Sequence, residues 1–359
     1  MFVGRECFLV EKVRVGVTGA GGEARWYMDA YTRTGFSELA VVQDVDEAKA
    51  REQGERFGVE WTTDYRRLLA DDIDVVDVST PNHVHAEQTI AALEAGKHVL
   101  CQKPMAPSVA ECDSMLEAAD RTRRKLGIYM GSLSSPLFHE LREMIAAGVF
   151  GTISSFSWRG AHRGGYEAKD NTAWRGSVEK TGGGAFIQLA IHGINLYQWL
   201  MGEDFVAVSA RSTNRLCRHS IGGDDLTHAV AEFDGGAYAT FEAGYSAEGG
   251  FLGFYGTKGS FVQVAGMTLL WSTEPWHGEI ISYEPKPGKE MTILDPKVLS
   301  ERQAPLYGRY DQHAAFIRSI TEDTTPPVPG ALGRRDVAIC QAVYRSAREG
   351  RSIRIEDVS

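Results

Sequence analysis

A glycine-rich turn directly after the first β-branched run is the feature that most constrains this chain. The run VRVGV, which begins at Val13, leads into Gly19-Ala-Gly-Gly-Glu-Ala24, a G-x-G-x-x-A pattern. Further β-branched runs follow up to about Ser132, and they alternate with helical patterns such as DEAKAREQGERFG and HAEQTIAALEAG. Strands that alternate with helices of this length predict βαβ units and one parallel sheet. We therefore predict an α/β fold whose first domain, residues 1–132, is a doubly wound Rossmann sheet that binds a dinucleotide.

The glycine turn has the chemistry of a pyrophosphate loop. Gly19 allows the tight turn, Gly21 and its neighbour Gly22 let the backbone approach phosphates, and Ala24 permits close helix packing. Asp44 ends the second β-branched run, VVQD, near the spacing at which a carboxylate binds the adenosine ribose. A carboxylate there repels the extra phosphate of NADP, so we expect NAD, with NADP the weaker candidate. The alternative is that Asp44 merely caps the helix that starts at Asp46.

Charge and cysteine usage exclude several classes of protein. The 38 basic and 48 acidic side chains give a net charge of −10, which disfavours nucleic acid and anionic membranes as partners. The 5 cysteines are odd in number and scattered, so we expect a reduced cytoplasmic protein with no disulfide framework and no metal site. No stretch approaches 18 uncharged apolar residues, and we therefore expect no membrane segment.

The second part of the chain is punctuated by glycine. The sequence holds 39 glycines, where average usage predicts roughly 25, and many separate β-rich runs such as THAVAEFD and YATFEAGY after Gly151. Pairs such as Gly235-Gly236 between two runs indicate hairpins. We predict a second α/β domain, residues 133–359, with a large open, mainly antiparallel sheet. One helix, 185–201, lies within it, and two helices close the chain.

A long ungapped segment resembles a known family. Residues 74–106 read DVVDVSTPNHVHAEQTIAALEAGKHVLCQKPMA. They are similar to the S-T-P-N-x-x-H and A-G-K-H-V-L-C-E-K-P segments of the Gfo/Idh/MocA oxidoreductases, whose namesakes are glucose-fructose oxidoreductase and inositol dehydrogenase. A Trp-Arg pair, a GGG turn before a helix and the ending VYRSAREGRSI follow in family order. The resemblance implies a Rossmann domain joined to a second domain with an open sheet.

The resemblance also implies cofactor contacts. Thr80, Asn82 and His85 would touch the cofactor at the carboxyl ends of the strands, where open α/β sheets bind ligands. Thr80 to Asn82 could instead form an ordinary turn and helix cap. By the same resemblance Gln102 and Lys103 flank the cofactor, and the pair Trp174 and Arg175 reaches toward the nicotinamide.

The resemblance places the reacting residues on two segments. Lys103 would lie nearest the reacting carbon, where burial lowers a lysine pKa and allows proton exchange with a substrate hydroxyl. Gln188 and His192 are four residues apart and therefore share one helix face, which Asn195 is expected to extend. His192 is the candidate base, although a lone histidine on an apolar helix is more often a core residue.

Three of these positions depart from the family. Gln102, Gln188 and Asn195 stand where its members often carry acids. Without a neighbouring carboxylate, His192 should stay neutral to lower pH. Gln188 could bond a substrate hydroxyl.

The segment RGAHRGGYEAKDNTAWRG suits a sugar or cyclitol substrate, because aromatic faces and polar groups alternate in it. Arg163 and Tyr166 are the candidate contacts, and a solvated loop is the alternative. We expect an NAD-dependent dehydrogenase that acts on a ring secondary alcohol and assembles as a homodimer or homotetramer. The alternatives are a redox-primed sugar eliminase or glycosidase that retains NAD, and a non-catalytic NAD-sensing regulatory protein.

Overall fold

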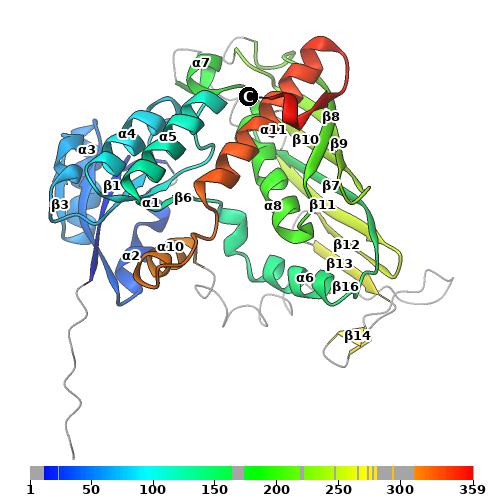
Figure 1. Ribbon diagram of the computed structural model, residues 1–359, viewed down its shortest axis with the longest axis horizontal. Helices are drawn as coiled ribbons and strands as arrows, with labels where there is room; N and C mark the ends of the chain where they lie inside the picture. Colours follow the sequence, from blue (N-terminus) through cyan, green and yellow to red (C-terminus); the bar gives the residue numbers. More distant parts are fainter. Residues whose placement is uncertain are drawn as a thin grey trace, which may run out of the picture.

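The computed structural model describes residues 12–22, 24–163, 174–218, 222–245, 248–264, 267–272, 275–276, 279–280, 293–294 and 311–358. The first part forms a parallel sheet in the order β3-β2-β1-β4-β5-β6, seen on the left of Figure 1. Its strands are β1 (Val13–Thr18), β2 (Ser37–Gln43), β3 (Glu60–Thr62), β4 (Val75–Val78), β5 (His98–Cys101) and β6 (Leu126–Ile128). β4 is buried at every residue, as expected for a parallel strand that is covered on both faces. This order confirms the doubly wound Rossmann sheet.

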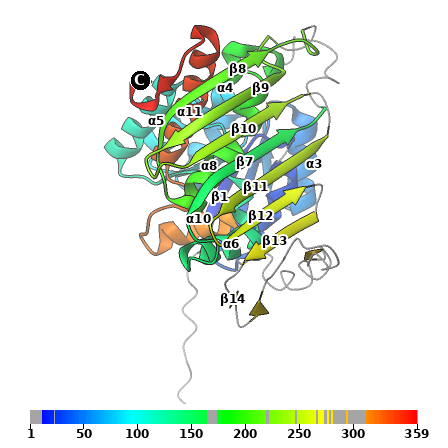
Figure 2. The same ribbon diagram turned by 90° about the vertical axis from the view of Figure 1, so that its right-hand side faces the viewer.

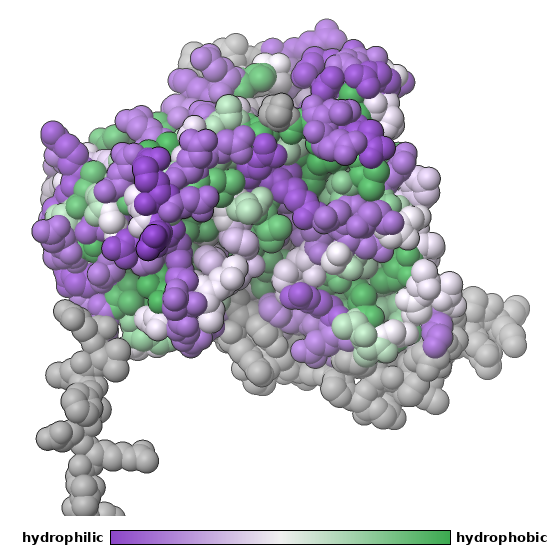
Figure 3. Space-filling model, viewed as in Figure 1, coloured by the Kyte–Doolittle hydropathy of each residue, from purple (hydrophilic) through white to green (hydrophobic). Residues whose placement is uncertain are grey.

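Helices cover both faces of this sheet. The short helices α1 (Ala24–Tyr27) and α2 (Asp29–Arg33) follow the glycine turn, and α3 (Glu47–Phe57), α4 (Asn82–Glu94) and α5 (Val109–Thr122) are the longer crossovers. Ser108 accepts a hydrogen bond from the backbone of Glu111 at the start of α5, a local cap that the sequence encodes. On the face seen in Figure 1, hydrophilic residues dominate over α3 to α5, with smaller hydrophobic areas between them (Figure 3).

The second sheet is mixed and mostly antiparallel, in the order β16-β13-β12-β11-β7-β10-β9-β8-β17. Its strands are β7 (Ile153–Ala161), β8 (Phe205–Thr213), β9 (Leu226–Phe233), β10 (Tyr238–Gly244), β11 (Gly249–Gly256), β12 (Gly259–Val264), β13 (Met267–Ser272), β16 (Ile293–Leu294) and β17 (Ile353–Arg354). Within this second sheet, β7 and β10 form the only parallel pair among the described strands. Buried and exposed residues alternate strictly along β9 from Thr227 onward, so one face packs inward and the other faces outward. Figure 2 shows the outward face with no helix of the described residues in front of it.

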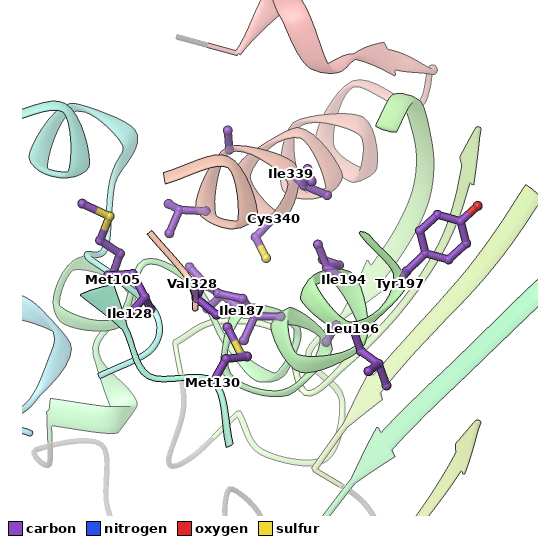
Figure 4. Close-up of a cluster of buried hydrophobic side chains, with 14 of the residues drawn as sticks. Met105, Ile128, Met130, Ile187, Ile194, Leu196, Tyr197, Val328, Ile339 and Cys340 are labelled. Atoms are coloured by element: carbon purple, nitrogen blue, oxygen red, sulfur yellow. The ribbon is translucent and has the colours of Figure 1, made fainter. Parts of the chain in front are cut away.

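The inward face packs on helices that link the two sheets. These are α6 (Pro136–Ala146), α8 (Ile191–Met201) and α11 (Gly330–Glu349), with the short α7 (Val178–Thr181) at one end. One hydrophobic core runs from the Rossmann sheet through α8 and α11 to the second sheet. Figure 4 shows this cluster extending from Met105, in the loop after β5, and Ile128 of β6 to Ile187, just before α8, Ile194 of α8 and Cys340 of α11. The two sheets therefore share one core.

One segment near the end of the chain returns to the first sheet. Helix α10 (Gln312–Thr321) contributes Phe316 and Ile317 to a second core cluster, together with Val15 and Val17 of β1. A Cβ atom at Gly127 in β6 would lie 2.7 Å from the Phe316 ring, so this glycine permits the close approach. Helix α10 therefore covers a face of the nucleotide-binding sheet, although it lies far outside residues 1–132.

Candidate active site

The glycine turn after β1 is held in place by Asp44 from the end of β2. Gly19 has a φ of +90°, and a Cβ atom there would lie 2.5 Å from the Ser79 carbonyl oxygen. Asp44 accepts a hydrogen bond from Ala20 N at 2.8 Å and another from Asp46 N at 2.9 Å. Asp46 is the residue that caps α3. Asp44 therefore ties the glycine turn to the start of α3 and does more than cap a helix.

The same turn fits a dinucleotide. A Cβ atom at Gly21 would contact only the Lys49 side chain, at 3.5 Å, and one at Gly22 would meet nothing within 4 Å. No side chain therefore covers the backbone of Gly21 and Gly22 on the side from which phosphates would approach. Each Asp44 oxygen accepts one hydrogen bond and retains a lone pair for a ribose hydroxyl. The geometry of Gly19, Gly21, Gly22 and Asp44 is thus compatible with a bound dinucleotide.

Two residues in the first turn of α4, which follows β4, connect segments around the site. Asn82 donates from Nδ2 to the Thr181 carbonyl at 3.1 Å. The ring nitrogens of His85 lie 2.7 Å from the carbonyl oxygen of Thr80 and 3.0 Å from that of Pro104. Both side chains are buried, and burial lowers the pKa of His85. Asn82 and His85 therefore fix the backbone of three loops, whereas Thr80 keeps partly exposed surface.

Lys103 lies just after β5 and reaches the helix of the second domain. Its Nζ atom donates to the Gln188 carbonyl oxygen at 3.1 Å, and the Lys103-Pro104 peptide bond is cis. Gln102 is buried, with Oε1 accepting from Lys103 N at 3.2 Å and Nε2 donating to the Tyr27 hydroxyl at 3.1 Å. The structure thus brings together Lys103 and Gln188, which are separated by 85 residues in the sequence.

Gln188 lies in a π-helical turn, η4 (Phe186–Ala190), that leads into α8. Asp224 holds the start of this turn by accepting from Gly184 N at 2.9 Å and from Phe186 N at 3.0 Å. The Gln188 Nε2 atom is buried and has no hydrogen-bond partner among the described residues. Because an unpaired buried donor is unfavourable, this amide is suited to bond a ligand oxygen.

Asn195 does not extend the face of Gln188 and His192, so that expectation was wrong. Its Nδ2 atom donates to Asp336 Oδ2 of α11 at 2.8 Å, and the residue is buried between the two helices. A π turn holds more residues per turn than an α-helix, so a seven-residue spacing that spans it no longer returns to the same face. Asn195 therefore belongs to the packing of α8 on α11.

His192 lines a cavity of about 500 Å³ on the inward face of the second sheet. Trp158, His162, Leu189 and Gln263 also line this cavity. Burial and the nearby Lys103 ammonium hold the pKa of His192 well below its usual range. His192 is thus neutral near pH 7, the expected direction, and can accept a proton.

His162 is a residue that the sequence analysis did not single out. It follows β7, and its ring lies 5.2 Å from that of Tyr245, centroid to centroid. Burial lowers the pKa of His162, and the cations of Arg175 and Lys103 act in the same direction. One feature of the sequence could have indicated His162: it directly follows a β-rich run and precedes Arg163, a candidate substrate contact.

The remaining candidates lie near this cavity or outside the described residues. The Arg175 guanidinium stacks 4.5 Å from the centre of the Trp174 ring in η3 (Trp174–Gly176). Arg163 is exposed, its backbone N donates to Glu248 at 3.1 Å, and it does not line the His192 cavity. Tyr166 lies outside the described residues.

Two family models match the chain, one over each part. Residues 13–130 match the oxidoreductase family with an NAD-binding Rossmann fold, and residues 142–355 match the C-terminal alpha/beta domain of that family. The chain belongs to the Gfo/Idh/MocA oxidoreductase family. NAD is therefore its cofactor class, and the resemblance read from residues 74–106 is confirmed.

Curated relatives in this family carry names of sugar and cyclitol enzymes. A levoglucosan dehydrogenase from Pseudarthrobacter phenanthrenivorans is 30% identical over 290 residues, 70% of this chain and 74% of that protein. A 1,5-anhydro-D-fructose reductase from Ensifer adhaerens is 28% identical, covering 96% of this chain and 98% of that protein. A myo-inositol 2-dehydrogenase from Thermotoga maritima is 25% identical, covering 96% and 99%.

Solved structures show the same fold. An NAD-binding oxidoreductase from Klebsiella pneumoniae has a TM-score of 0.82 at 21% identity, and the match covers 96% of this chain and 99% of that chain. A levoglucosan dehydrogenase in complex with NADH and levoglucosan has a TM-score of 0.80 at 24% identity, with the same coverage. Within the described residues, no helix combines the length and the apolar character needed to cross a membrane.

Proposed function

We propose that this Gfo/Idh/MocA oxidoreductase transfers a hydride between NAD and a ring secondary alcohol of a sugar, sugar derivative or inositol. The observation that carries the proposal is the bond from Lys103 Nζ to the Gln188 carbonyl oxygen. It joins the carboxyl edge of the nucleotide-binding sheet to the helix that carries His192. The names of the curated relatives support a sugar or cyclitol as the substrate.

The side chains divide the work of alcohol oxidation between them. Gly19 to Gly22 and Asp44 would hold NAD, which when bound supplies the acceptor for the hydride. His192 takes the hydroxyl proton, because its imidazole is neutral. Lys103 polarises the reacting oxygen as a carbonyl develops.

Substrate recognition would draw on the His192 cavity and on Gln188, which does not line that cavity but precedes Leu189, which does. The Gln188 amide, otherwise unpaired, donates to a neighbouring hydroxyl. Trp158 offers an apolar surface for the C–H face of a ring. Arg163 and Tyr166 remain candidate contacts from the adjoining segment, and Thr80, Trp174 and Arg175 remain candidate contacts to the cofactor.

A substrate panel tests this proposal. NADH formation at 340 nm is measured with levoglucosan, other anhydrosugars, aldoses, glycosides and inositols. We expect at least one compound to be oxidised, and Lys103→Ala to lower kcat by roughly 10²- to 10⁴-fold while NAD affinity stays within twofold. Lys12→Ala, an exposed lysine before β1, is the matched control. A panel without turnover, or a Lys103→Ala variant with the parent kcat, would contradict the assignment.

We also propose that the outward face of the second sheet binds a second copy of the chain. Val230, Tyr238 and Tyr255 are 45%, 56% and 55% exposed on neighbouring parts of this face. Large apolar side chains in such number on an uncovered sheet face favour association.

A further inference from the structure

A series of buried hydrogen bonds lies beneath Lys103. The Lys103 support chain, as we name it, consists of Gln102, Tyr27, Ser79 and Asp77. It begins where Gln102 Oε1 accepts from Lys103 N at 3.2 Å. Because a backbone N–H can only donate, this contact fixes the orientation of the Gln102 amide. Nε2 must then face the Tyr27 hydroxyl, 3.1 Å away, and donate to it.

The other end of the support chain is a carboxylate that accepts hydrogen bonds. Ser79 Oγ donates to Asp77 Oδ1 at 2.7 Å, and the Tyr31 hydroxyl donates to Asp77 Oδ2 at 2.6 Å. His313 Nε2 lies 3.9 Å from the same carboxylate. Asp77 is 2% exposed, so these groups replace its water. Burial raises the pKa of Asp77, and His313 and the hydrogen bonds from Tyr31 and Ser79 act in the opposite direction, in favour of the carboxylate.

These two ends give every hydrogen bond in the support chain one direction. The Tyr27 and Ser79 hydroxyl oxygens are hydrogen-bonded to each other. Tyr27 accepts from Gln102, and Ser79 gives its own proton to Asp77, so the Tyr27 proton points to Ser79. Each group donates to the next, from the Gln102 amide to the Asp77 carboxylate. A residue at position 102 must therefore be a donor toward Tyr27 and an acceptor toward Lys103 N.

A glutamate at position 102, as in the family, does not satisfy this pattern. Its carboxylate offers no proton to Tyr27, and a second negative charge would enter a network that already contains Asp77. Glutamine meets both demands. The single carboxylate of the support chain then lies two hydroxyl groups away from position 102, and not beside Lys103.

We propose that Gln102, Tyr27 and Asp77 are positioning residues, which fix the backbone of Lys103 and keep the buried negative charge of this region away from its ammonium. The proposal rests on the proposed function only in assigning Lys103 to the chemistry. The cation of Lys103 also acts on His192 and His162, and Arg175 acts on His162. On the other side, Asp77 is faced by Tyr27, Tyr31 and His313, and His313 also contacts Asp311.

Exchanging the charge between the two ends tests the proposal. The double variant combines Gln102→Glu with Asp77→Asn. In it, the new asparagine amide donates to Ser79, Ser79 donates to Tyr27, and Tyr27 donates to the new glutamate. Every hydrogen bond of the support chain is then formed again, with its donor and acceptor exchanged. We expect each single variant to lower the denaturant midpoint and the double variant to recover at least half of the summed loss. Strictly additive losses would overturn the proposal. If the Gln102→Glu variant does not fold, we still expect the double variant to fold. If neither variant folds, the proposal is contradicted.

The chemistry of Lys103 is read separately, without a substrate. The rate at which acetic anhydride labels the Lys103 amine, followed by mass spectrometry across pH, reports its titration. We expect the pH midpoint of Lys103 labelling to rise by about one pH unit in Gln102→Glu and to stay raised in the double variant. The double variant should therefore recover stability toward the parent value, whereas its labelling midpoint should not return to the parent value. An unchanged midpoint in Gln102→Glu would overturn the proposal.

Tyr31→Phe is the matched control, because it removes a hydrogen bond to Asp77 outside the support chain. It should lower stability and leave the Lys103 midpoint unchanged. With a compound from the panel, Gln102→Glu should lower kcat at least tenfold, with less than a twofold change in the KM for NAD. If the panel shows no turnover, the proposed function fails, whereas the unfolding and labelling results still decide the role of the support chain.

Discussion

Gly19 and Gly21 occupy one turn for different physical reasons. At Gly19, a Cβ atom would lie 2.5 Å from the backbone of Ser79, so the protein itself excludes a side chain. At Gly21, the Cβ atom would make only an ordinary contact, 3.5 Å from the Lys49 side chain. The fold therefore does not require glycine at position 21, whereas the proposed approach of a pyrophosphate would.

Gly21→Val should accordingly separate cofactor binding from folding. We expect the Kd for NADH, measured by fluorescence titration, to rise at least tenfold, because the valine occupies the space where the phosphates approach. The thermal midpoint should change by less than about 3 °C, which corresponds to less than roughly 1 kcal/mol. Gly21→Ala serves as the graded control with a smaller effect. An unchanged Kd in the valine variant would mean that the phosphates bind elsewhere.

The residues found from the sequence directly follow strands of the first sheet or lie in segments that resemble the family. Gly19 and Asp44 follow consecutive strands, and Lys103 follows a third, so a βαβ pattern is enough to place them at one edge. His162 and Asp77 escaped notice because their surroundings come from distant segments. His162 is influenced by Lys103 and Arg175, and Asp77 faces α10.

At the scale of elements, the packing of α8 on α11 contains a buried acid. Asp336 of α11 accepts from Asn195 at 2.8 Å and from Gln198 at 2.8 Å, and it is fully buried. Burial raises the pKa of Asp336 to about 7. The amide oxygens of Asn195 and Gln198 have no hydrogen-bond partner among the described residues. A protonated acid or an asparagine at position 336 could donate to either oxygen after an amide rotation.

Asp336→Asn should therefore stabilise the protein in a pH-dependent way. In the unfolded chain, an aspartate ionises near pH 4, whereas Asp336 in the folded protein keeps its proton up to about pH 7. Between these pH values, ionisation stabilises the unfolded chain only, so the parent loses stability as the pH rises. The variant lacks that loss. We expect its advantage in unfolding free energy to be on the order of 3 kcal/mol larger at pH 8 than at pH 4, as measured by urea denaturation. An equal difference at both pH values would show that Asp336 titrates normally.

The π turn before α8 could not be predicted from its residues. The stretch AFIQLAIHGINLYQWL is apolar on nearly every side, so no period in it reveals where a turn widens. What holds η4 are the bonds from Gly184, Phe186 and Ile187 to the distant Asp224 and Tyr344. Gln188 and His192 were expected to share one helix face, and the segment between them lies partly within this turn. The expectation that Asn195 lies on the same face assumed a regular α-helix from Gln188 to Asn195.

At the scale of the whole molecule, the type and order of the sheets were predictable and their joining was not. Alternating strands and helices indicated the Rossmann sheet, and glycine-separated β-rich runs indicated the antiparallel one. The return of α10 to the first sheet depends on the fit between Phe316 and Gly127, two residues far apart in the chain. No local pattern reports such a contact.

Association through the outward sheet face predicts a specific outcome. Tyr238→Lys together with Val230→Lys places two charges on that face, where pairing would bury them without partners. We expect the parent to sediment as a dimer or tetramer at micromolar concentration and the double variant to sediment as a monomer. Val45→Lys, 89% exposed on the nucleotide-binding domain, is the control. A parent that sediments as a monomer would disprove the assembly.

The core that runs from Met105 and Ile128 through Ile187 and Ile194 to the second sheet limits how such a protein can diversify. A cofactor half and a substrate half that merely touched could be exchanged between relatives as modules. Here each half supplies side chains that fill the interior of the other. A chimera would inherit mismatched volumes, and its junction would have to be redesigned before it folded. New substrates are therefore more readily acquired by changing the cavity around His192 than by recombining whole domains.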